Sequence, residues 1–293
     1  MKAFTIKDLE NLSGIKAHTI RIWEQRYSFL KPQRTPTNIR YYTNQELKII
    51  LNISLLNKFG YKISHIASMT DTEIREKILA LTNVEAQQER IVNDLIQAMV
   101  DLRLEEFEQI LDNYILVRGI ERTITHIIFP FLVRIGILWL TSHVNAAQEH
   151  IVTNIIRQKM IVGIEMSVSH VRLNKSVLLF LPESEFHELG LLFIHYLLKC
   201  RGVSVLYLGA SVPLDDIEYV AKLKKPDYVF SHLTAISHSF NMEKFLQQLS
   251  KKVDHSSIII SGPVTCSYDG KLPPKVFFKR SLQELTEFIT ALQ

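Results

Sequence analysis

The residues best suited to do chemistry are Glu185, His187 and Gly190, which form the pattern E-x-H-x-x-G directly after the apolar run VLLFL. An imidazole at such a position can ligate a metal, and a carboxylate two residues earlier can orient the ring from its other nitrogen. Glycine lets a cofactor or another backbone approach closely. The pattern has the form of an oriented, metal-ligating histidine, although a lone histidine at the end of a strand is more often a surface or capping residue.

A second set of candidate residues lies in the segment AHTIRIWEQRY, residues 17–27. Ile20, Trp23 and Tyr27 recur at three and four and predict the buried face of a helix. Thr19, Arg21 and Arg26 are then left on the outer face, where a guanidinium can grip a phosphate or a guanine edge with two hydrogen bonds. This arrangement predicts the recognition helix of a helix-turn-helix.

The flanking residues predict a winged form of that motif. Thr5 and Thr43 are suited to cap helices, and Ser13-Gly14 marks a tight turn between the first two helices. The stretch KPQRTPTN stops helix formation, and Arg40-Tyr41-Tyr42 suits a short strand, so a β-hairpin wing is expected, with Arg34 and Arg40 near the DNA backbone. Residues 1–70 hold eleven Lys/Arg against four Asp/Glu, although the net charge of the chain is only +4. Such a basic end favours a phosphate partner over a merely solvated face.

The periodicity changes twice along the chain. Residues 84–170 show helical spacing, as in Ile91, Leu95 and Met99, and predict four helices. From Ser176 apolar strands alternate with helices (strands at 177–181, 203–209, 228–233 and 257–262), which predicts a parallel, doubly wound sheet. The expected protein is multidomain, α and α/β: a winged helix-turn-helix head (1–75), a four-helix bundle (80–172) and a Rossmann-like domain (174–293).

The segment TIRIWEQRYSFLKPQRTPTNIRYY resembles the head of the MerR family. The usual wing glycine is absent, and Asn38 is expected to take its left-handed conformation. The resemblance implies binding as a homo-oligomer, a dimer or tetramer, to a near-palindromic site in double-stranded DNA. The residues expected at this interface are His18, Thr19, Arg21, Arg26, Tyr27, Arg34, Arg40 and Tyr41.

The C-terminal part resembles cobalamin-binding domains, whose motif is D-x-H-x-x-G, and the resemblance implies that His187 is the lower ligand of cobalt. LGASVPLDDI, Ser231-His232-Leu233 and Ser261-Gly262 resemble later elements of the same domain. Trp139 and Glu149-His150 resemble the motif that covers the upper face of the cofactor in the CarH/LitR photoreceptor group. The implied cofactor-binding residues are Glu185, His187, Gly190, Ser231, Leu233, Gly262, Trp139, Glu149 and His150.

The resemblance to the CarH/LitR group implies a repressor, not an enzyme, whose assembly and DNA binding respond to a cobalamin, adenosylcobalamin first, with light as a further input. Three departures keep other interpretations open: Glu185 replaces Asp, Ser261 replaces a glycine beside the nucleotide tail, and Leu140 replaces a histidine that ligates cobalt after photolysis. One alternative is a pocket for another tetrapyrrole such as haem, or no ligand at all. A remote alternative is a cobalamin-dependent methyl carrier or enzyme, and the other histidines show no metal-like spacing.

The composition fits a cytoplasmic protein. Cys200 and Cys266 are isolated, which argues against a disulfide scaffold, and the start of the chain lacks the apolar stretch of a signal peptide. The most apolar run, IIFPFLVRIGILWL, contains Arg134 and falls short of the roughly 20 residues that span a bilayer. No membrane association is expected.

Overall fold

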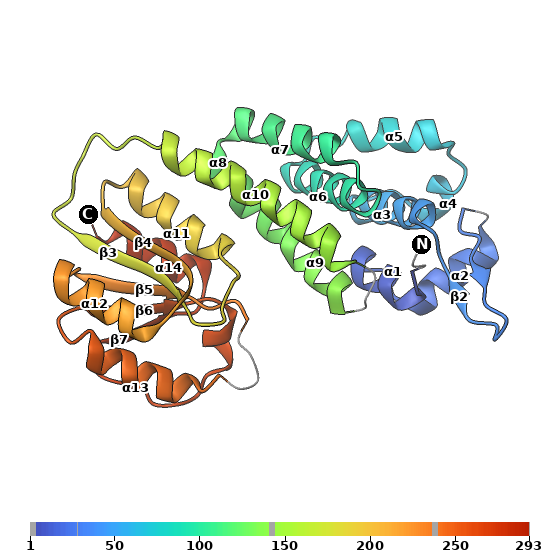
Figure 1. The fold of residues 1–293 in the computed structure, drawn as a ribbon. Helices are drawn as coiled ribbons and strands as arrows, with labels where there is room; N and C mark the ends of the chain where they lie inside the picture. Colours follow the sequence, from blue (N-terminus) through green and yellow to red (C-terminus); the bar gives the residue numbers. More distant parts are fainter. Residues whose placement is uncertain (1–3, 28, 141–143, 236–239, 293) are drawn as a thin grey trace. The chain divides into compact units, whose positions relative to one another are not determined.

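The computed structural model describes residues 4–27, 29–140, 144–235 and 240–292, except for the side chain of Leu140. The chain forms two compact units, Met1–Ile155 and Ile156–Gln293 (Figure 1). The boundary between them falls inside helix α10 (Ala146–Met166). Each unit is described by itself.

The first unit begins with the expected helices of the head. They are α1 (Ile6–Ser13), α2 (Ala17–Arg26), α3 (Asn44–Lys58), α4 (Ile63–Ile66) and α5 (Asp71–Leu79). Thr5 and Thr43 both cap helices, since each side chain accepts a backbone N–H three residues on and a carboxylate at that position accepts the cap N–H. Gly14 ends α1 with a φ of 74°, which lets the chain turn tightly into α2.

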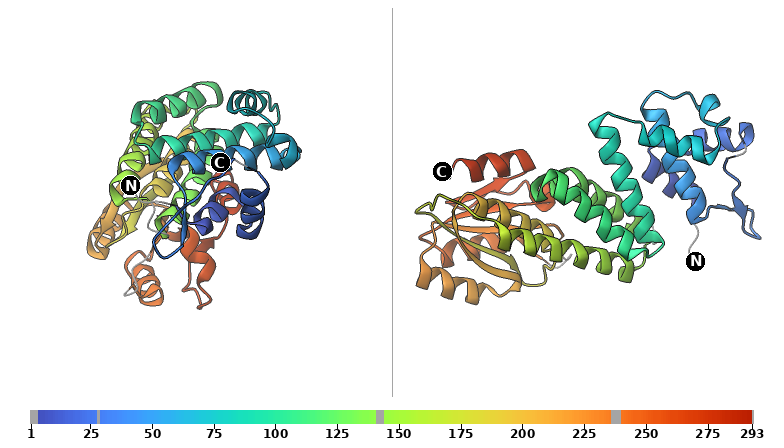
Figure 2. Two further views of the ribbon diagram at one scale, coloured as in Figure 1. Left: turned by 90° about the vertical axis from the view of Figure 1, so that its right-hand side faces the viewer. Right: turned by 90° about the horizontal axis from the view of Figure 1, so that it is seen from above.

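The wing is a short antiparallel hairpin of β1 (Gln33–Arg34) and β2 (Arg40–Tyr41), as predicted. Asn38 sits at its tip with a φ of 65°, so the left-handed conformation expected of it is confirmed. The isolated bridge between Phe4 and Tyr42 joins the base of the wing to the start of the chain. The hairpin projects from the helices of the head (Figures 1 and 2).

The helices that follow are α6 (Val84–Val100), α7 (Leu104–Arg118), a continuous helical run and α10. That run consists of α8 (Ile120–Thr123), the π-helical turn η1 (Ile124–Ile128) and α9 (Phe129–Leu140). Its inner face is fully buried, and the rings of Phe107 and Phe131 lie 5.4 Å apart. Arg134 binds Asn93 and, at 3.3 Å, Glu89, so its charge has partners inside the bundle.

This helical run also bears on membrane association. By length and composition alone Ile120–Trp139 is long and apolar enough to cross a membrane, so the prediction that it is too short was wrong. The prediction counted a shorter apolar run, whereas the helix begins several residues earlier. Its buried residues, among them Ile124, Phe131 and Leu138, pack against other helices, as in the core helix of a bundle.

The second unit contains a five-stranded parallel sheet of order β4-β3-β5-β6-β7. Its strands are β3 (Ser176–Pro182), β4 (Ser204–Val212), β5 (Tyr228–His232), β6 (Ser257–Ser261) and β7 (Val276–Lys279). Helices α12 (Leu214–Lys224) and α13 (Met242–Lys252) cover one face. Helices α11 (Leu189–Cys200) and α14 (Leu282–Thr290) cover the other face (Figure 1). The doubly wound α/β prediction is confirmed.

The strand order creates a topological switch point. The first strand, β3, lies between β4 and β5, so the connections that leave β3 and β5 run in opposite directions. Ligands of open α/β sheets bind at the carboxyl edge where this happens. The loops after β3 and β5 meet at this edge, and they carry the E-x-H-x-x-G pattern and the residues after Ser231.

Candidate functional site

The recognition helix α2 has the faces that its sequence predicts. Ile20 and Trp23 are buried, whereas His18, Arg21 and Arg26 are exposed. Thr19 is half-buried, with its hydroxyl 3.4 Å from the ring of His18. A row of exposed basic side chains beside small polar ones suits a helix that enters the major groove of DNA.

The wing is fixed to α2 by Glu24, a residue that sequence reasoning missed. Its carboxylate accepts a hydrogen bond from Arg40 Nε at 3.1 Å and another from the hydroxyl of Tyr42. Burial and the bond to Glu24 raise the pKa of Tyr42, so the phenol stays protonated. Arg40 therefore positions the wing against the recognition helix through Nε. Its other two guanidinium nitrogens are the ones that could contact DNA.

The other predicted DNA contacts are distributed over the hairpin and its base. Arg34 donates to Asn38 Oδ1 at 2.7 Å, which stiffens the tip of the wing. The hydroxyl of Tyr41 donates to Gln33 Oε1 at 2.5 Å across the hairpin. Tyr27 is half-buried and stacks on Phe29 with ring centroids 5.7 Å apart. The head thus presents a preorganised basic surface.

In the second unit Glu185 organises the carboxyl edge of the sheet. Its side chain is buried, at 3% exposure, and His187 donates to Oε1 twice, from its backbone N–H at 2.8 Å and from Nδ1 at 2.6 Å. The backbone N–H of Ala235, in the loop after β5, donates to Oε2 at 3.0 Å. Burial opposes ionisation, but these hydrogen bonds and the charge of His187 lower the pKa of Glu185 below its ordinary value.

His187 is the residue that Glu185 holds in place. Its side chain is 60% exposed, and because Nδ1 is bound to Glu185, a metal would be ligated through Nε2. The extra methylene of Glu185, compared with aspartate, therefore does not prevent the expected carboxylate–histidine geometry. The arrangement fits a cobalt ligand of fixed tautomer and orientation.

Three further predicted residues lie at the ends of β5 and β6. Ser231 is fully buried, and its Oγ has no hydrogen-bond partner among the described residues. The N–H of Leu233 donates to the carbonyl of Ser261 at 2.8 Å. Gly262 has a φ of 101°, and a Cβ on it would lie 2.3 Å from the carbonyl oxygen of Leu233. An unpaired buried hydroxyl beside such a turn is what a polar ligand atom would complete.

Gly190 lies on the first turn of α11, next to the ring of His232. A Cβ at position 190 would come within 2.2 Å of that ring, so a larger residue would have to displace His232. Nearby Glu188, which sequence reasoning also missed, accepts from Arg157 Nε at 2.7 Å and from the hydroxyl of Tyr207 at 2.8 Å. Its position directly after His187 was the only signal that could have singled it out.

The remaining predicted cofactor residues belong to the first unit. Trp139 is 50% exposed near the end of α9, and Glu149 and His150 form an ion pair of 3.2 Å in the first turn of α10. The exposed rings of Trp139 and His150 could face a planar ligand, and the half-buried Glu149 holds the imidazole of His150. The side chain of Leu140 and the whole of His143 lie outside the described residues.

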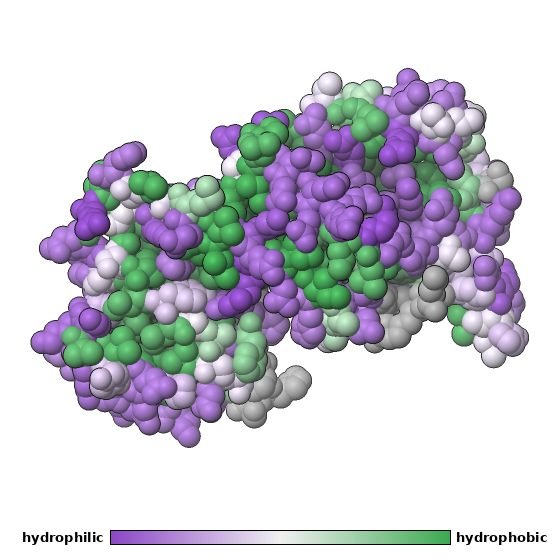
Figure 3. Space-filling view, turned by 45° about the horizontal axis from the view of Figure 1, so that its top comes forward, coloured by the Kyte–Doolittle hydropathy of each residue, from purple (hydrophilic) through white to green (hydrophobic). Residues whose placement is uncertain are grey.

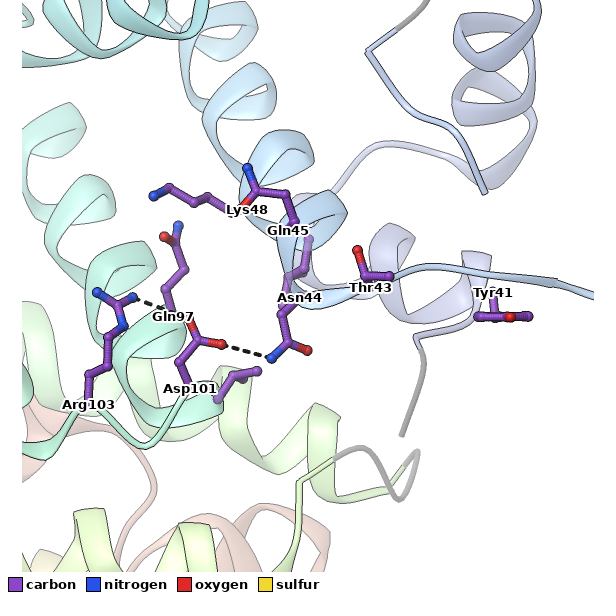
Figure 4. A pocket seen from close by; sticks show the side chains of 10 residues that line it. Tyr41, Thr43, Asn44, Gln45, Lys48, Gln97, Asp101 and Arg103 are labelled. Atoms are coloured by element: carbon purple, nitrogen blue, oxygen red, sulfur yellow. Dashed lines mark hydrogen bonds and ion pairs between the residues drawn. The ribbon is translucent and has the colours of Figure 1, made fainter. Parts of the chain in front are cut away.

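A pocket of about 490 Å³ lies within the first unit, between the base of the wing and the bundle (Figure 4). Asn44, in the first turn of α3, donates to Asp101 Oδ1 at 2.8 Å, and Arg103 lies 3.4 Å from the same carboxylate. Gln148, in the first turn of α10, donates to the backbone oxygen of Val100 at 3.0 Å. The turn after α6 thus contacts both the DNA-binding head and the helix that carries Glu149 and His150.

Comparison with known proteins assigns both parts of the first unit. Residues 4–73 match the family model described as MerR HTH family regulatory protein, and residues 91–162 match the model of a B12 binding domain. The chain is thus a MerR-type, DNA-binding transcriptional regulator that carries a B12-binding domain. The resemblance deduced from the two motifs is confirmed.

The named relatives are repressors. The chain is 26% identical over 258 residues to the HTH-type transcriptional repressor CarH of Myxococcus xanthus, covering 85% of this chain and 84% of the relative. It is also 26% identical over 226 residues to the repressor CarA of the same organism, covering 76% and 74% of the two chains. These relatives are not enzymes, which agrees with the expectation for this chain.

The fold also occurs in a corrinoid protein of known structure. The monomethylamine corrinoid protein of Methanosarcina barkeri superimposes with a TM-score of 0.54 at 13% identity, covering 70% of this chain and all of that one. At this identity the likeness concerns the fold alone.

Proposed function

We propose that this chain is a cytoplasmic transcriptional repressor whose assembly and DNA binding are controlled by a cobalamin-type corrinoid bound through His187. The observation that carries the proposal is the geometry of Glu185 and His187 at the switch point of the sheet, where the buried acid fixes one ring nitrogen and so orients the imidazole as a ligand. The corrinoid supplies a cobalt centre with an exchangeable upper ligand, and adenosylcobalamin is the form that we propose first.

On the DNA side we propose that His18, Thr19, Arg21, Arg26 and Tyr27 enter the major groove. Arg34, Arg40 and Tyr41 then contact the neighbouring backbone, with Arg40 held by Glu24. One head reads only half of a near-palindromic site, so a dimer or tetramer is required for strong binding. The three-domain division at residues 75–80 and 172–174 belongs to the same proposal.

For corrinoid binding to affect DNA binding, the corrinoid must bind one conformation of the chain more tightly than the other. Equal affinity for both conformations would not change their populations. We propose that Trp139, Glu149 and His150 contact the upper face of the ring. The turn at Asp101 supports this, since it binds the first turn of α3 and lies beside the backbone that Gln148 holds. A shift of α10 would therefore reach the base of the wing.

The test is a dark titration of the purified protein with adenosylcobalamin, followed by absorbance and size-exclusion chromatography. Uptake of one equivalent with a change in assembly supports the proposal, provided that His187→Ala abolishes uptake. His255→Ala, which changes an exposed histidine of the same unit, is the matched control. Binding of haem instead favours the other tetrapyrrole. Control by such a ligand is overturned if the protein binds neither haem, nor adenosylcobalamin, nor a corrinoid without the nucleotide tail.

Whether the protein loaded with adenosylcobalamin responds to light needs a second experiment. Illumination of the loaded form that releases the upper ligand and changes assembly supports a photoreceptor. Leu140 has no nitrogen to occupy the vacated position, so any light response has to use another ligand. An unchanged elution profile after illumination restricts the proposal to corrinoid control in the dark.

A further inference from the structure

The ring of His232 fills the space beside Gly190. His232 ends β5, and its Cδ2 and Nε2 atoms lie 2.2 and 2.4 Å from where a Cβ of residue 190 would stand. Its Nδ1 is 2.8 Å from the hydroxyl of Ser261, at the end of β6. The two side chains thus form a hydrogen-bonded pair that closes the carboxyl edge of the sheet against the first turn of α11.

The hydrogen-bonded pair of His232 and Ser261 is uncharged and can be stable inside the protein. Burial lowers the pKa of His232 to about 4, and the carboxylate of Glu185 opposes this only in part, so the ring is neutral near pH 7. A neutral imidazole needs one donor and one acceptor partner, and Ser261 provides one of them in either tautomer. Neither member is a charged group that would draw water into the site.

The space beside Gly262, at the same edge of the sheet, is filled as well. The carbonyl oxygen of Leu233 lies 2.3 Å from where a Cβ of Gly262 would stand, so the backbone itself occupies that position. The protein's own atoms therefore fill the space that a glycine would otherwise leave at both places. The site can thus supply a histidine ligand for cobalt, but it leaves little room for a long group beside that histidine.

In complete cobalamin, the group that would have to enter this space is the nucleotide tail. This tail hangs from the lower face of the corrin ring, the face that a coordinating histidine approaches. If Nε2 of His187 ligates cobalt, the tail has to descend beside His187 towards the carboxyl edge of the sheet. Gly190, three residues after His187 at the start of α11, lies at this edge, and His232 and Ser261 lie beside it at the ends of β5 and β6.

We propose that His232 and Ser261 are specificity-determining residues that exclude the nucleotide tail, so that this chain prefers a corrinoid without the tail over complete cobalamin. The inference rests on the proposed function and narrows its ligand. Complete cobalamin can bind only when the ring of His232 leaves its place, which breaks its hydrogen bond to Ser261. We expect the wild type to bind cobinamide roughly tenfold to a hundredfold more tightly than adenosylcobalamin, the cost of that rearrangement.

The experiment compares aquocobinamide and adenosylcobalamin by absorbance titration in the dark, with the shift of the cobalt spectrum on histidine ligation as the readout. The double variant H232A/S261G is expected to gain about tenfold or more in affinity for adenosylcobalamin and to keep its affinity for cobinamide within about threefold. Retained cobinamide binding also shows that this variant is folded. His255→Ala is the control and is expected to change neither affinity.

The wild-type comparison alone can overturn the inference, whatever the stability of the variant. Equal or tighter binding of adenosylcobalamin than of cobinamide overturns it and leaves the proposed function intact. An unchanged preference in the folded double variant also overturns it. Failure of the wild type to take up either corrinoid overturns the proposed function and the inference together.

Discussion

Replacing Glu185 with glutamine changes one atom of the side chain at the point where it orients His187. The carboxylate accepts three N–H groups, at 2.6, 2.8 and 3.0 Å. A glutamine amide has one accepting oxygen, so its NH₂ group must face at least one of these donors. Losing a hydrogen bond to a charged, buried acceptor costs about 1.5–3 kcal/mol of unfolding free energy.

The same change releases the imidazole from its fixed orientation. Loss of a partner that orients a metal ligand typically weakens metal binding by about 10–100-fold. Cobinamide is the better probe here, because it reports ligation by His187 without a nucleotide tail. The assay is an absorbance titration, with urea unfolding measured on the same preparations.

Glu183→Gln is the matched control, because Glu183 is an exposed carboxylate two residues earlier in the same loop. We expect it to leave both the affinity for cobinamide and the free energy of unfolding unchanged. If Glu185→Gln also binds cobinamide within twofold of the wild type, Glu185 does not orient His187 and the reasoning about the site is wrong.

Four further predictions concern other parts of the chain. Arg26→Ala should weaken DNA binding and, if Arg26 contacts a phosphate, lower the salt slope by about 0.9, whereas Arg118→Ala on the bundle should change neither. The pKa of His232 falls from 6.5 to about 4 on folding, so between these pH values the unfolded chain binds an extra proton. The free energy of unfolding should therefore decline as the pH falls from 6.5 to about 4, by roughly 3 kcal/mol at most. Urea unfolding at a series of pH values should show a shallower decline for His232→Ala than for the wild type. Ser231→Ala should leave the protein without corrinoid as stable or about 1 kcal/mol more stable, since an unpaired buried hydroxyl is removed, and a loss above 2 kcal/mol in thermal or urea unfolding contradicts this. Asn44→Ala should leave the affinities for DNA alone and for corrinoid alone nearly unchanged but reduce the effect of one on the other, which anisotropy titrations with both ligands can measure.

Local features of the chain could be predicted because they depend on neighbouring residues. The caps at Thr5 and Thr43 need only the residues that follow them, and the wing follows from a run that stops helices before a short strand. The left-handed conformation of Asn38 was expected from the resemblance to the MerR head, where a glycine usually stands in the wing, and from the tolerance of asparagine for that conformation. The four strands expected from apolar runs also formed, although β4 continues to Val212.

What could not be predicted depends on residues distant in sequence. Glu24 binds Arg40 and Tyr42 only after the wing folds back on α2. The strand β7 is only four residues long, which is too short a run to stand out in the sequence, and it pairs with the edge of β6. The histidine at position 232 looked like one of several scattered rings, and its meeting with Gly190 and Ser261 required the order of the sheet strands.

A corrinoid held by His187 is proposed to control DNA binding. The most direct measurement is the affinity for a DNA fragment selected from genomic DNA, determined by fluorescence anisotropy in the dark with and without saturating cobinamide and adenosylcobalamin. The account predicts that a corrinoid changes the affinity of the wild type by at least about tenfold, a typical allosteric coupling, and leaves that of His187→Ala unchanged. Equal affinities with and without both corrinoids, in a wild type shown by absorbance to be loaded, would contradict it.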